Sequence, residues 1–135
     1  MTRLLGADGG HPVWSPDGKR LVFRGYSTEG GSLFSKPADG SGATERISSP
    51  TPEEPVPGSW TAKSNILVFE QDLLDDRGDM YADIHVLPMD GQQEPRPWAT
   101  TPSVAECGPR LSPDERWVAY TAYSRTAGRL GVFVA

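Results

Sequence analysis

The stretch PVWSPDGKRLVF at residues 12–23 decides the fold, because its pattern returns twice along the chain. Residues 58–69 read GSWTAKSNILVF, and residues 109–120 read PRLSPDERWVAY. In each copy a polar turn stands between two short segments, and the second segment is apolar. Three aligned copies in one chain indicate an internal structural repeat.

A second motif repeats between these copies. Residues 33–40 read LFSKPADG and residues 84–91 read IHVLPMDG. The whole unit is therefore about 40 to 50 residues long, and units of that length made of strands and turns are typical of β-propeller blades. The composition agrees, because 15 glycines and 13 prolines in 135 residues favour short strands and many turns over helices.

Each part of the unit has a physical reading. Ser-Pro-Asp-Gly at residues 15–18 is a type I turn signature, since Pro presets φ at the second position and Gly accommodates the exit. The following run Leu21–Phe23 is apolar on both faces, which suits a strand between two neighbouring sheets. The Asp-Gly pairs at residues 39–40 and 90–91 are two-residue hairpin signals that link a third strand to a fourth.

We therefore expect an all-β chain that forms a partial β-propeller of about three four-stranded antiparallel blades, the third one incomplete. The single segment 1–135 divides into blades at about residues 11–48, 56–100 and 107–135, with residues 1–8 as the outer strand of a preceding or partner blade. The expected inner strands are 13–15, 58–61 and 108–112, and the central strands are 20–24, 66–70 and 117–122. The third strands are 32–36, 83–87 and 129–134, and the outer strands are 44–48 and 96–100.

The repeats resemble those of TolB-like, WD-type β-propellers. The resemblance rests on the Ser-Pro-Asp-Gly turn, the strand pattern (Leu or Val)-x-(Phe or Tyr) after it and the later Asp-Gly, and it covers residues 9–135. The third copy, residues 106–134, also resembles propellers attached to bacterial serine/threonine kinases. Two positions depart from the pattern: Thr61–Ser64 lacks the Pro-Asp-Gly turn, and Glu115 replaces the turn glycine.

This resemblance implies a non-catalytic module that binds or scaffolds a protein or peptide, in a periplasmic or envelope-associated setting by analogy with TolB. Two other settings stay open: the sensory propeller of a bacterial serine/threonine kinase, and the gating propeller of a prolyl-oligopeptidase-type serine peptidase. Propellers bind partners through loops and the central channel. The candidate binding residues are therefore polar ones at or near the starts of inner strands, namely His11, Glu54, Glu106 and Arg110.

Composition and motifs disfavour several other functions. A net charge of −5 disfavours a nucleic-acid partner. No segment approaches the roughly 20 apolar residues of a membrane span, and Met1–Gly10 has no signal-peptide pattern, so direct membrane insertion is not expected. Without a Gly-x-Ser-x-Gly elbow, a phosphate-binding loop or metal-ligand spacing, we expect no catalytic residue, cofactor or metal. The missing blades are expected from the same polypeptide or from a second copy.

Some individual residues invite a functional reading that their context does not favour. The acidic stretch from Asp72 to Asp83 is expected to be a solvated hairpin loop and not a calcium site, and Arg-Gly-Asp at residues 77–79 a chance match. Cys107 is expected to be a small buried residue, and His85 a packed or edge residue of a third strand. The four tryptophans, Trp14, Trp60, Trp98 and Trp117, are expected to pack between blades or in the core.

Overall fold

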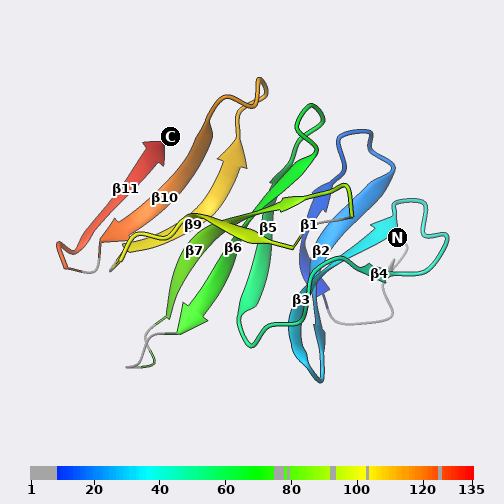
Figure 1. Ribbon diagram of the computed structural model, residues 1–135, viewed down its shortest axis with the longest axis horizontal. Coiled ribbons are helices and arrows are strands. Elements are labelled where there is room, and N and C mark those ends of the chain that lie inside the picture. The colour runs from blue at the N-terminus through cyan, green and yellow to red at the C-terminus, as the bar shows by residue number, and fades with distance from the viewer. Residues whose placement is uncertain (1–8, 75–77, 79, 92–93, 103, 125) are drawn as a thin grey trace.

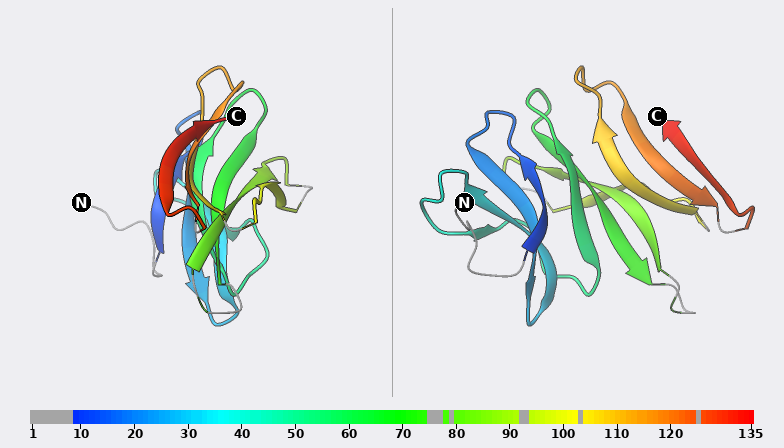
Figure 2. Two further views of the ribbon diagram at one scale, coloured as in Figure 1. Left: turned by 90° about the vertical axis from the view of Figure 1, so that its left-hand side faces the viewer. Right: turned by 180° about the vertical axis from the view of Figure 1, so that it is seen from behind.

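A computed structural model describes residues 9–74, 78, 80–91, 94–102, 104–124 and 126–135. All regular structure in this part of the chain is β-strand, arranged as three antiparallel sheets that lie side by side and do not close into a ring (Figures 1 and 2). No helix long and apolar enough to cross a membrane occurs among these residues. The expected all-β, partial-propeller fold with an incomplete third blade is confirmed.

Each sheet is one blade, and its strands follow one another in chain order. Blade 1 contains β1 (Gly9–Trp14), β2 (Arg20–Ser27), β3 (Gly30–Pro37) and β4 (Glu45–Arg46). Blade 2 contains β5 (Glu54–Trp60), β6 (Ile66–Leu74), β7 (Met80–Pro88) and β8 (Arg96–Ala99). Blade 3 contains β9 (Val104–Leu111), β10 (Val118–Ser124) and β11 (Arg129–Val134). The inner strands of blades 1, 2 and 3 are therefore β1, β5 and β9.

Within the described residues the strand predictions are right in number and order, but several boundaries were wrong. The outer strand expected at residues 1–8 lies outside the described residues. The strand expected at residues 129–134 is β11, with the same bounds. All three inner strands begin earlier than expected. The first residues of β1 and β5 include Gly9, Gly10, Pro55 and Pro57, which an edge strand tolerates and a sequence pattern assigns to loops. The outer strand expected at residues 44–48 shortens to two residues.

Two further expectations were wrong. The Asp-Gly pairs at residues 39–40 and 90–91 are not two-residue hairpin loops, because the connections run from Pro37 to Glu45 and from Pro88 to Arg96. The acidic stretch is not all loop, because Asp72 and Asp83 lie half-buried in β6 and β7. Asp72 lies there because β6 extends past its expected end, and Asp83 is a residue of the expected third strand. Asp75, Asp76, Arg77 and Asp79 lie outside the described residues.

The tryptophans are less buried than expected. Trp14, Trp98 and Trp117 are 59%, 40% and 50% exposed, and only Trp60 packs against the core. The difference between the equivalent residues Trp14 and Trp60 has a simple reason: β5 lies between two blades, whereas in the described residues no blade precedes β1. Trp98 contacts Tyr120 of blade 3 edge to face, with ring centroids 6.0 Å apart.

The Ser-Pro-Asp turn builds the same hairpin in blades 1 and 3. The Ser15 hydroxyl donates to Asp17 at 2.7 Å and accepts from the Arg20 backbone N–H at 2.8 Å. The equivalent Ser112 hydroxyl donates to Asp114 and accepts from the Trp117 N–H. The turn residue has φ of 69° at Gly18 and 60° at Glu115, so the glutamate keeps the left-handed geometry of the glycine it replaces.

Glu115 compensates for the other departure from the repeat. Its two carboxylate oxygens accept the backbone N–H groups of Lys63 and Ser64, each at 2.7 Å, in the turn that lacks Pro-Asp-Gly. These bonds lower the pKa of Glu115, although burial opposes them. One turn of blade 3 therefore supplies the acceptors that hold the neighbouring turn of blade 2.

An apolar layer joins blades 1 and 2. Val22 and Leu33 of blade 1 form one buried cluster with Leu67, Phe69 and Leu87 of blade 2. These residues come from the central and third strands, which explains why both repeat motifs carry apolar runs. Burial of such side chains contributes about 1.5–3 kcal/mol each, so the blades are held mainly by this layer.

Blade 3 reaches blade 2 through a backbone contact at Gly58. A Cβ atom at this position would lie 2.3 Å from the carbonyl oxygen of Pro109 and 2.9 Å from that of Val68. Both neighbours are backbone atoms and have little freedom to move. Glycine at residue 58 therefore sets how closely β9 approaches β5.

We expect Gly58→Ala to destabilise the chain by about 1–3 kcal/mol, because the added methyl group must push β9 away from β5. Urea denaturation followed by tryptophan fluorescence measures the change. Gly10→Ala is the matched control on another inner strand, since a Cβ there meets nothing within 4 Å. Equal stability of the two variants would contradict the close approach.

Removal of the Glu115 carboxylate should expose two amides of the neighbouring blade. In Glu115→Ala we expect faster hydrogen exchange at Lys63 and Ser64, measured by NMR, because both N–H groups lose their acceptor. Glu115→Gln should leave one of the two protected, since its amide has a single acceptor oxygen. Unchanged exchange at both amides in Glu115→Ala would show that the contact does not form.

Candidate binding surface on the inner strands

A polar layer lies directly beyond the apolar layer, at the end of the blades where the inner strands begin. Arg24 follows Phe23 in β2, and Glu70 follows Phe69 in β6, so the two occupy equivalent positions of the repeat. Each reaches from its central strand toward the inner strand of the next blade. Ionisable residues of all three blades meet here, and we call His11, Arg24, Glu54, Glu70, Asp72 and Arg110 the inner-strand cluster.

Arg24 links blade 1 to blade 2. Its Nη1 donates to Glu54 Oε2 at 2.7 Å, and its guanidinium lies over the Tyr26 ring at 5.2 Å from the centroid. The Arg24 side chain is 17% exposed, and its Nε is buried with no hydrogen-bond partner among the described residues. The guanidinium is thus fixed on one side and retains an unused donor.

Glu70 links blade 2 to blade 3, because its carboxylate accepts the backbone N–H of Gly108 in β9. Burial raises the pKa of this carboxyl above its ordinary value, although the Gly108 bond opposes the rise. The neighbouring Asp72 raises the pKa further, whereas the charges of His11 and Arg110 lower it. Residues of all three blades therefore affect the pKa of Glu70.

Asp72 extends the acidic part of the cluster. It stands opposite Glu54 in the register of β5 and β6. Burial raises the pKa of Asp72, the Glu54 carboxylate raises it further, and Arg24 and His11 oppose the change. Two half-buried acids thus lie near one another with incomplete compensation by positive charge.

The structure brings three of the four sequence-selected residues to this cluster. His11 lies at the bulge of β1 with φ of 54°, Glu54 begins β5, and Arg110 lies near the end of β9. Glu106 lies elsewhere: it is 2% exposed, and its carboxylate accepts the Thr101 N–H at 3.2 Å. Burial raises the pKa of Asp83 in β7, and the nearby Glu106 carboxylate raises it further.

Sequence reasoning missed Arg24, Glu70 and Asp72. The available signal was positional, because Arg24 and Glu70 are the first charged residues after the apolar run in their copies of the repeat. Asp72 was assigned to the acidic loop. The position alone does not tell whether a charged side chain contacts the next blade or faces solvent.

Cys107 lies beside the cluster and is half-buried. Burial raises the pKa of its thiol, and the charges of Glu70 and Asp72 raise it further. The thiol is therefore held in its neutral form, which is a poor nucleophile and metal ligand. Within the described ranges, no three His, Cys, Asp or Glu residues are arranged to hold a metal ion.

The pKa of Asp72 leads to a pH-dependent prediction. A carboxyl whose pKa is raised on folding destabilises the folded state when it ionises, so stability from this group falls as pH rises above the ordinary value of 3.8. We expect Asp72→Asn to stabilise the chain at pH 7 and the gain to shrink as pH falls toward 4. Urea denaturation at both pH values measures it.

Asp39→Asn is the control with the opposite sign. Bonds from Ser41 lower the pKa of Asp39, so the ionised form stabilises the fold. This variant should lose stability at pH 7, and the loss should shrink as Asp39 takes up its proton at lower pH. The same sign for both variants would contradict the assigned burial of Asp72.

Comparisons with solved structures support the fold. A putative TolB from Agrobacterium tumefaciens superposes with a TM-score of 0.70 at 20% identity, over 98% of this chain and 46% of that one. TolB from Acinetobacter baumannii gives 0.60 at 18% identity, over 94% and 32% of the two chains. Hydrazine synthase from Kuenenia stuttgartiensis gives 0.69 at 14% identity, over 93% and 23%.

The chain thus spans less than half the length of each of these structures. No protein-family model matches the sequence, and no curated protein matches it. The likeness at this identity concerns the fold, in the order of strands, the blades and their packing. This chain has a TolB-like β-propeller fold.

Proposed function

We propose that this chain is a non-catalytic propeller module that binds a protein or peptide partner at the inner-strand cluster. The observation that carries the proposal is the convergence of ionisable residues from all three blades around Glu70 and Asp72. Propellers present such ends as rigidly held surfaces. The TolB-like fold supports a module of this class without specifying the partner.

The charges of the cluster favour a partner that brings a cation. Burial and the neighbouring carboxylates raise the pKa of Glu70 and Asp72, so their ionised forms lack sufficient counter-charge. A Lys or Arg side chain, or an amino terminus, would supply that charge. The ion pair would form in a half-buried site, where charge-assisted hydrogen bonds are stronger than on an open surface.

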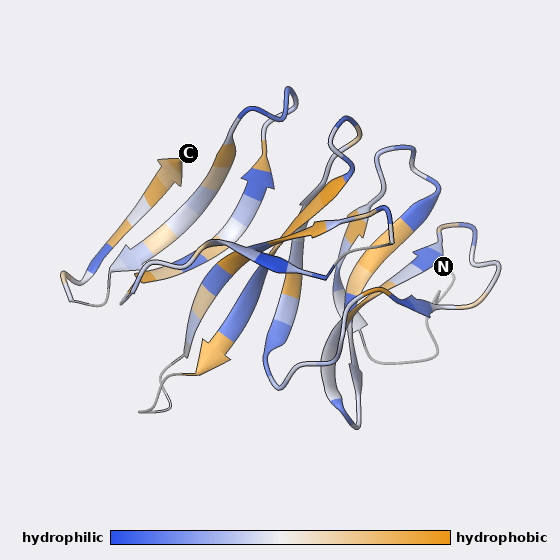
Figure 3. Cartoon of the chain, in the orientation of Figure 1, coloured by the Kyte–Doolittle hydropathy of each residue, from blue (hydrophilic) through white to orange (hydrophobic). Residues whose placement is uncertain are grey.

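Further blades are the second kind of partner. Along β11 the side chains of Leu130, Val132 and Val134 are 71%, 78% and 62% exposed, and this strand forms the open edge of a three-stranded sheet (Figure 3). An exposed apolar surface on a strand edge is normally covered. In the proposed assembly a strand and a blade from the same polypeptide or from a second copy cover it.

A peptide-display selection on the full chain tests the binding function. We expect enriched peptides to carry Lys or Arg, and the double variant Glu70→Gln, Asp72→Asn to weaken their binding about tenfold in fluorescence anisotropy titrations. Binding should also weaken from pH 7 to pH 5, since both acids have raised pKa values and take up protons in that direction.

Glu45→Gln is the control, because Glu45 lies in β4 and pairs with Arg20, away from the cluster. It should leave the affinity unchanged. Enriched peptides that bind the double variant as tightly as the natural chain would refute the inner-strand cluster as the binding site.

A further inference from the structure

A second surface lies on the outer side of the chain, between blades 1 and 2. Residues of the segment 46–50, together with Leu87, Pro88, Met89, Gly91 and Glu94, line a groove of about 760 Å³. A smaller hollow of about 210 Å³ shares Ser48, Ser49 and Glu94 with it and extends to Phe69 and His85. The volume of the larger hollow alone is in the range of ligand sites, which is about 300–1,000 Å³.

The floor of the groove is apolar and fixed. Leu87 is 2% exposed, and Ile47 and Met89 pack against the same buried cluster that joins the two blades. Phe69 stacks on His85 where the smaller hollow begins, with ring centroids 5.6 Å apart. A ligand side chain on this floor would meet a surface that the core already holds in place.

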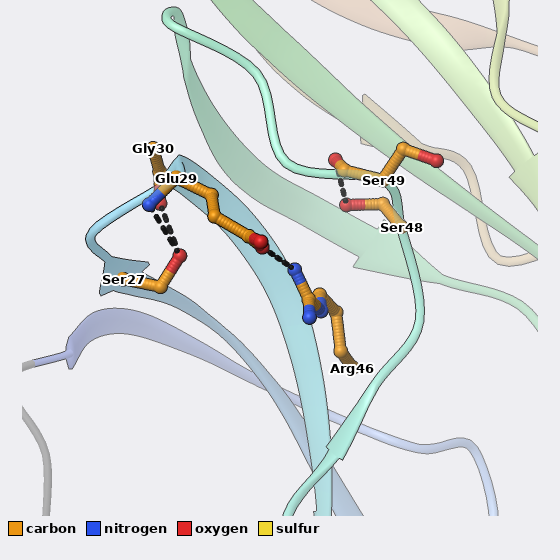
Figure 4. A network of polar contacts seen from close by, with 6 residues as sticks. All are labelled: Ser27, Glu29, Gly30, Arg46, Ser48 and Ser49. Carbon is orange, nitrogen blue, oxygen red and sulfur yellow. Dashed lines mark hydrogen bonds and ion pairs between the residues drawn. The ribbon is translucent and has the colours of Figure 1, made fainter.

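Arg46 lies at the rim of the groove, where a network of polar contacts fixes its side chain. Arg46 Nη1 donates to Glu29 Oε2 at 2.8 Å (Figure 4). The Ser27 hydroxyl accepts the Glu29 N–H at 3.2 Å and donates to the Gly30 carbonyl at 3.3 Å, which orders the turn that carries Glu29. On the other side, Ser48 Oγ accepts the Leu33 N–H at 2.9 Å.

Among the described residues, this network leaves one acid of the groove, Glu94, without an ion pair. Arg46 is the positive residue of the lining and is committed to Glu29, whereas Glu94 lines both hollows and forms no ion pair with the described residues. Glu94 is exposed at the rim, next to the apolar floor. The groove therefore combines a place for an apolar side chain with a place for a cation.

We infer that this groove binds an extended peptide in which an apolar side chain is adjacent to a Lys or Arg. The apolar side chain lies on the partly buried Ile47 and Met89, which cover Leu87, and the cation pairs with Glu94. The Ser49 hydroxyl faces the peptide backbone, whereas the Ser48 hydroxyl is held by Leu33 and Ser49 of this chain. Both walls of the groove belong to this chain, so the site is complete without further blades. It is separate from the inner-strand cluster and does not depend on the proposed function.

A labelled peptide library tests the inference on the full chain. Its members carry Leu or Met next to Lys or Arg in both orders, and a matched library carries Glu in place of the base. We expect saturable binding of basic members only, with shifts of the Ile47, Ser48 and Met89 amide signals in NMR spectra. Glu94→Lys should weaken binding about tenfold, and Met89→Ala about fivefold.

Glu45→Lys makes the same charge change outside the groove and should leave the affinity unchanged. Glu94 is exposed, so Glu94→Lys should leave the fold intact. This variant therefore still tests the inference if Met89→Ala destabilises the chain. The inference is overturned if no basic member shifts these amides, or if binding survives Glu94→Lys. It is also overturned if Asp72→Asn weakens binding of the basic peptides and Glu94→Lys does not. That result would support the inner-strand cluster as their binding site.

Discussion

The packing of one blade against the next is the constraint on which the rest of this structure depends. A blade of three or four strands has two faces and buries little surface alone, so its central strand must be covered on both sides. The apolar layer of Val22, Leu33, Leu67, Phe69 and Leu87 does this between blades 1 and 2. Between blades 2 and 3 the packing depends on Gly58. Only a glycine at this position allows the backbone of β9 to come so close to β5.

Polar contacts fix the blades at both ends of this packing. At the end where the inner strands begin, Arg24 pairs with Glu54 and Glu70 accepts the Gly108 N–H. Nearer the other end, Ser59 accepts the Leu111 N–H at 2.9 Å and Glu115 binds the neighbouring turn. The first end carries half-buried acids whose pKa values are raised, Glu70 and Asp72. The second end carries compact turns, where hydrogen bonds lower the pKa of acids such as Asp114 and Glu115. This difference is the reason that we propose recognition at the first end.

The sequence was sufficient for the parts of the fold that are encoded locally. Ser-Pro-Asp turns and the apolar runs after them predicted three blades and their strand order, since each depends on neighbouring residues. The starts of the inner strands were missed because Glu54–Pro57 reads as a loop. Contacts between blades were missed for a different reason. Arg24 and Glu70 look like ordinary charges, and Glu115 looks like a defect until its contact with Lys63 and Ser64 is seen.

The most direct test of this account is a set of nuclear Overhauser contacts in the isotopically labelled full chain. The packing predicts cross-peaks between the Hα protons of Gly58 and the ring of Pro109, whose Cγ would lie 3.0 Å from a Cβ at residue 58. It also predicts cross-peaks between the methyl groups of Val22 and those of Leu67 or Leu87. Cross-peaks within each sheet without these contacts between sheets would show three hairpin sheets that do not pack as blades, and would contradict the account.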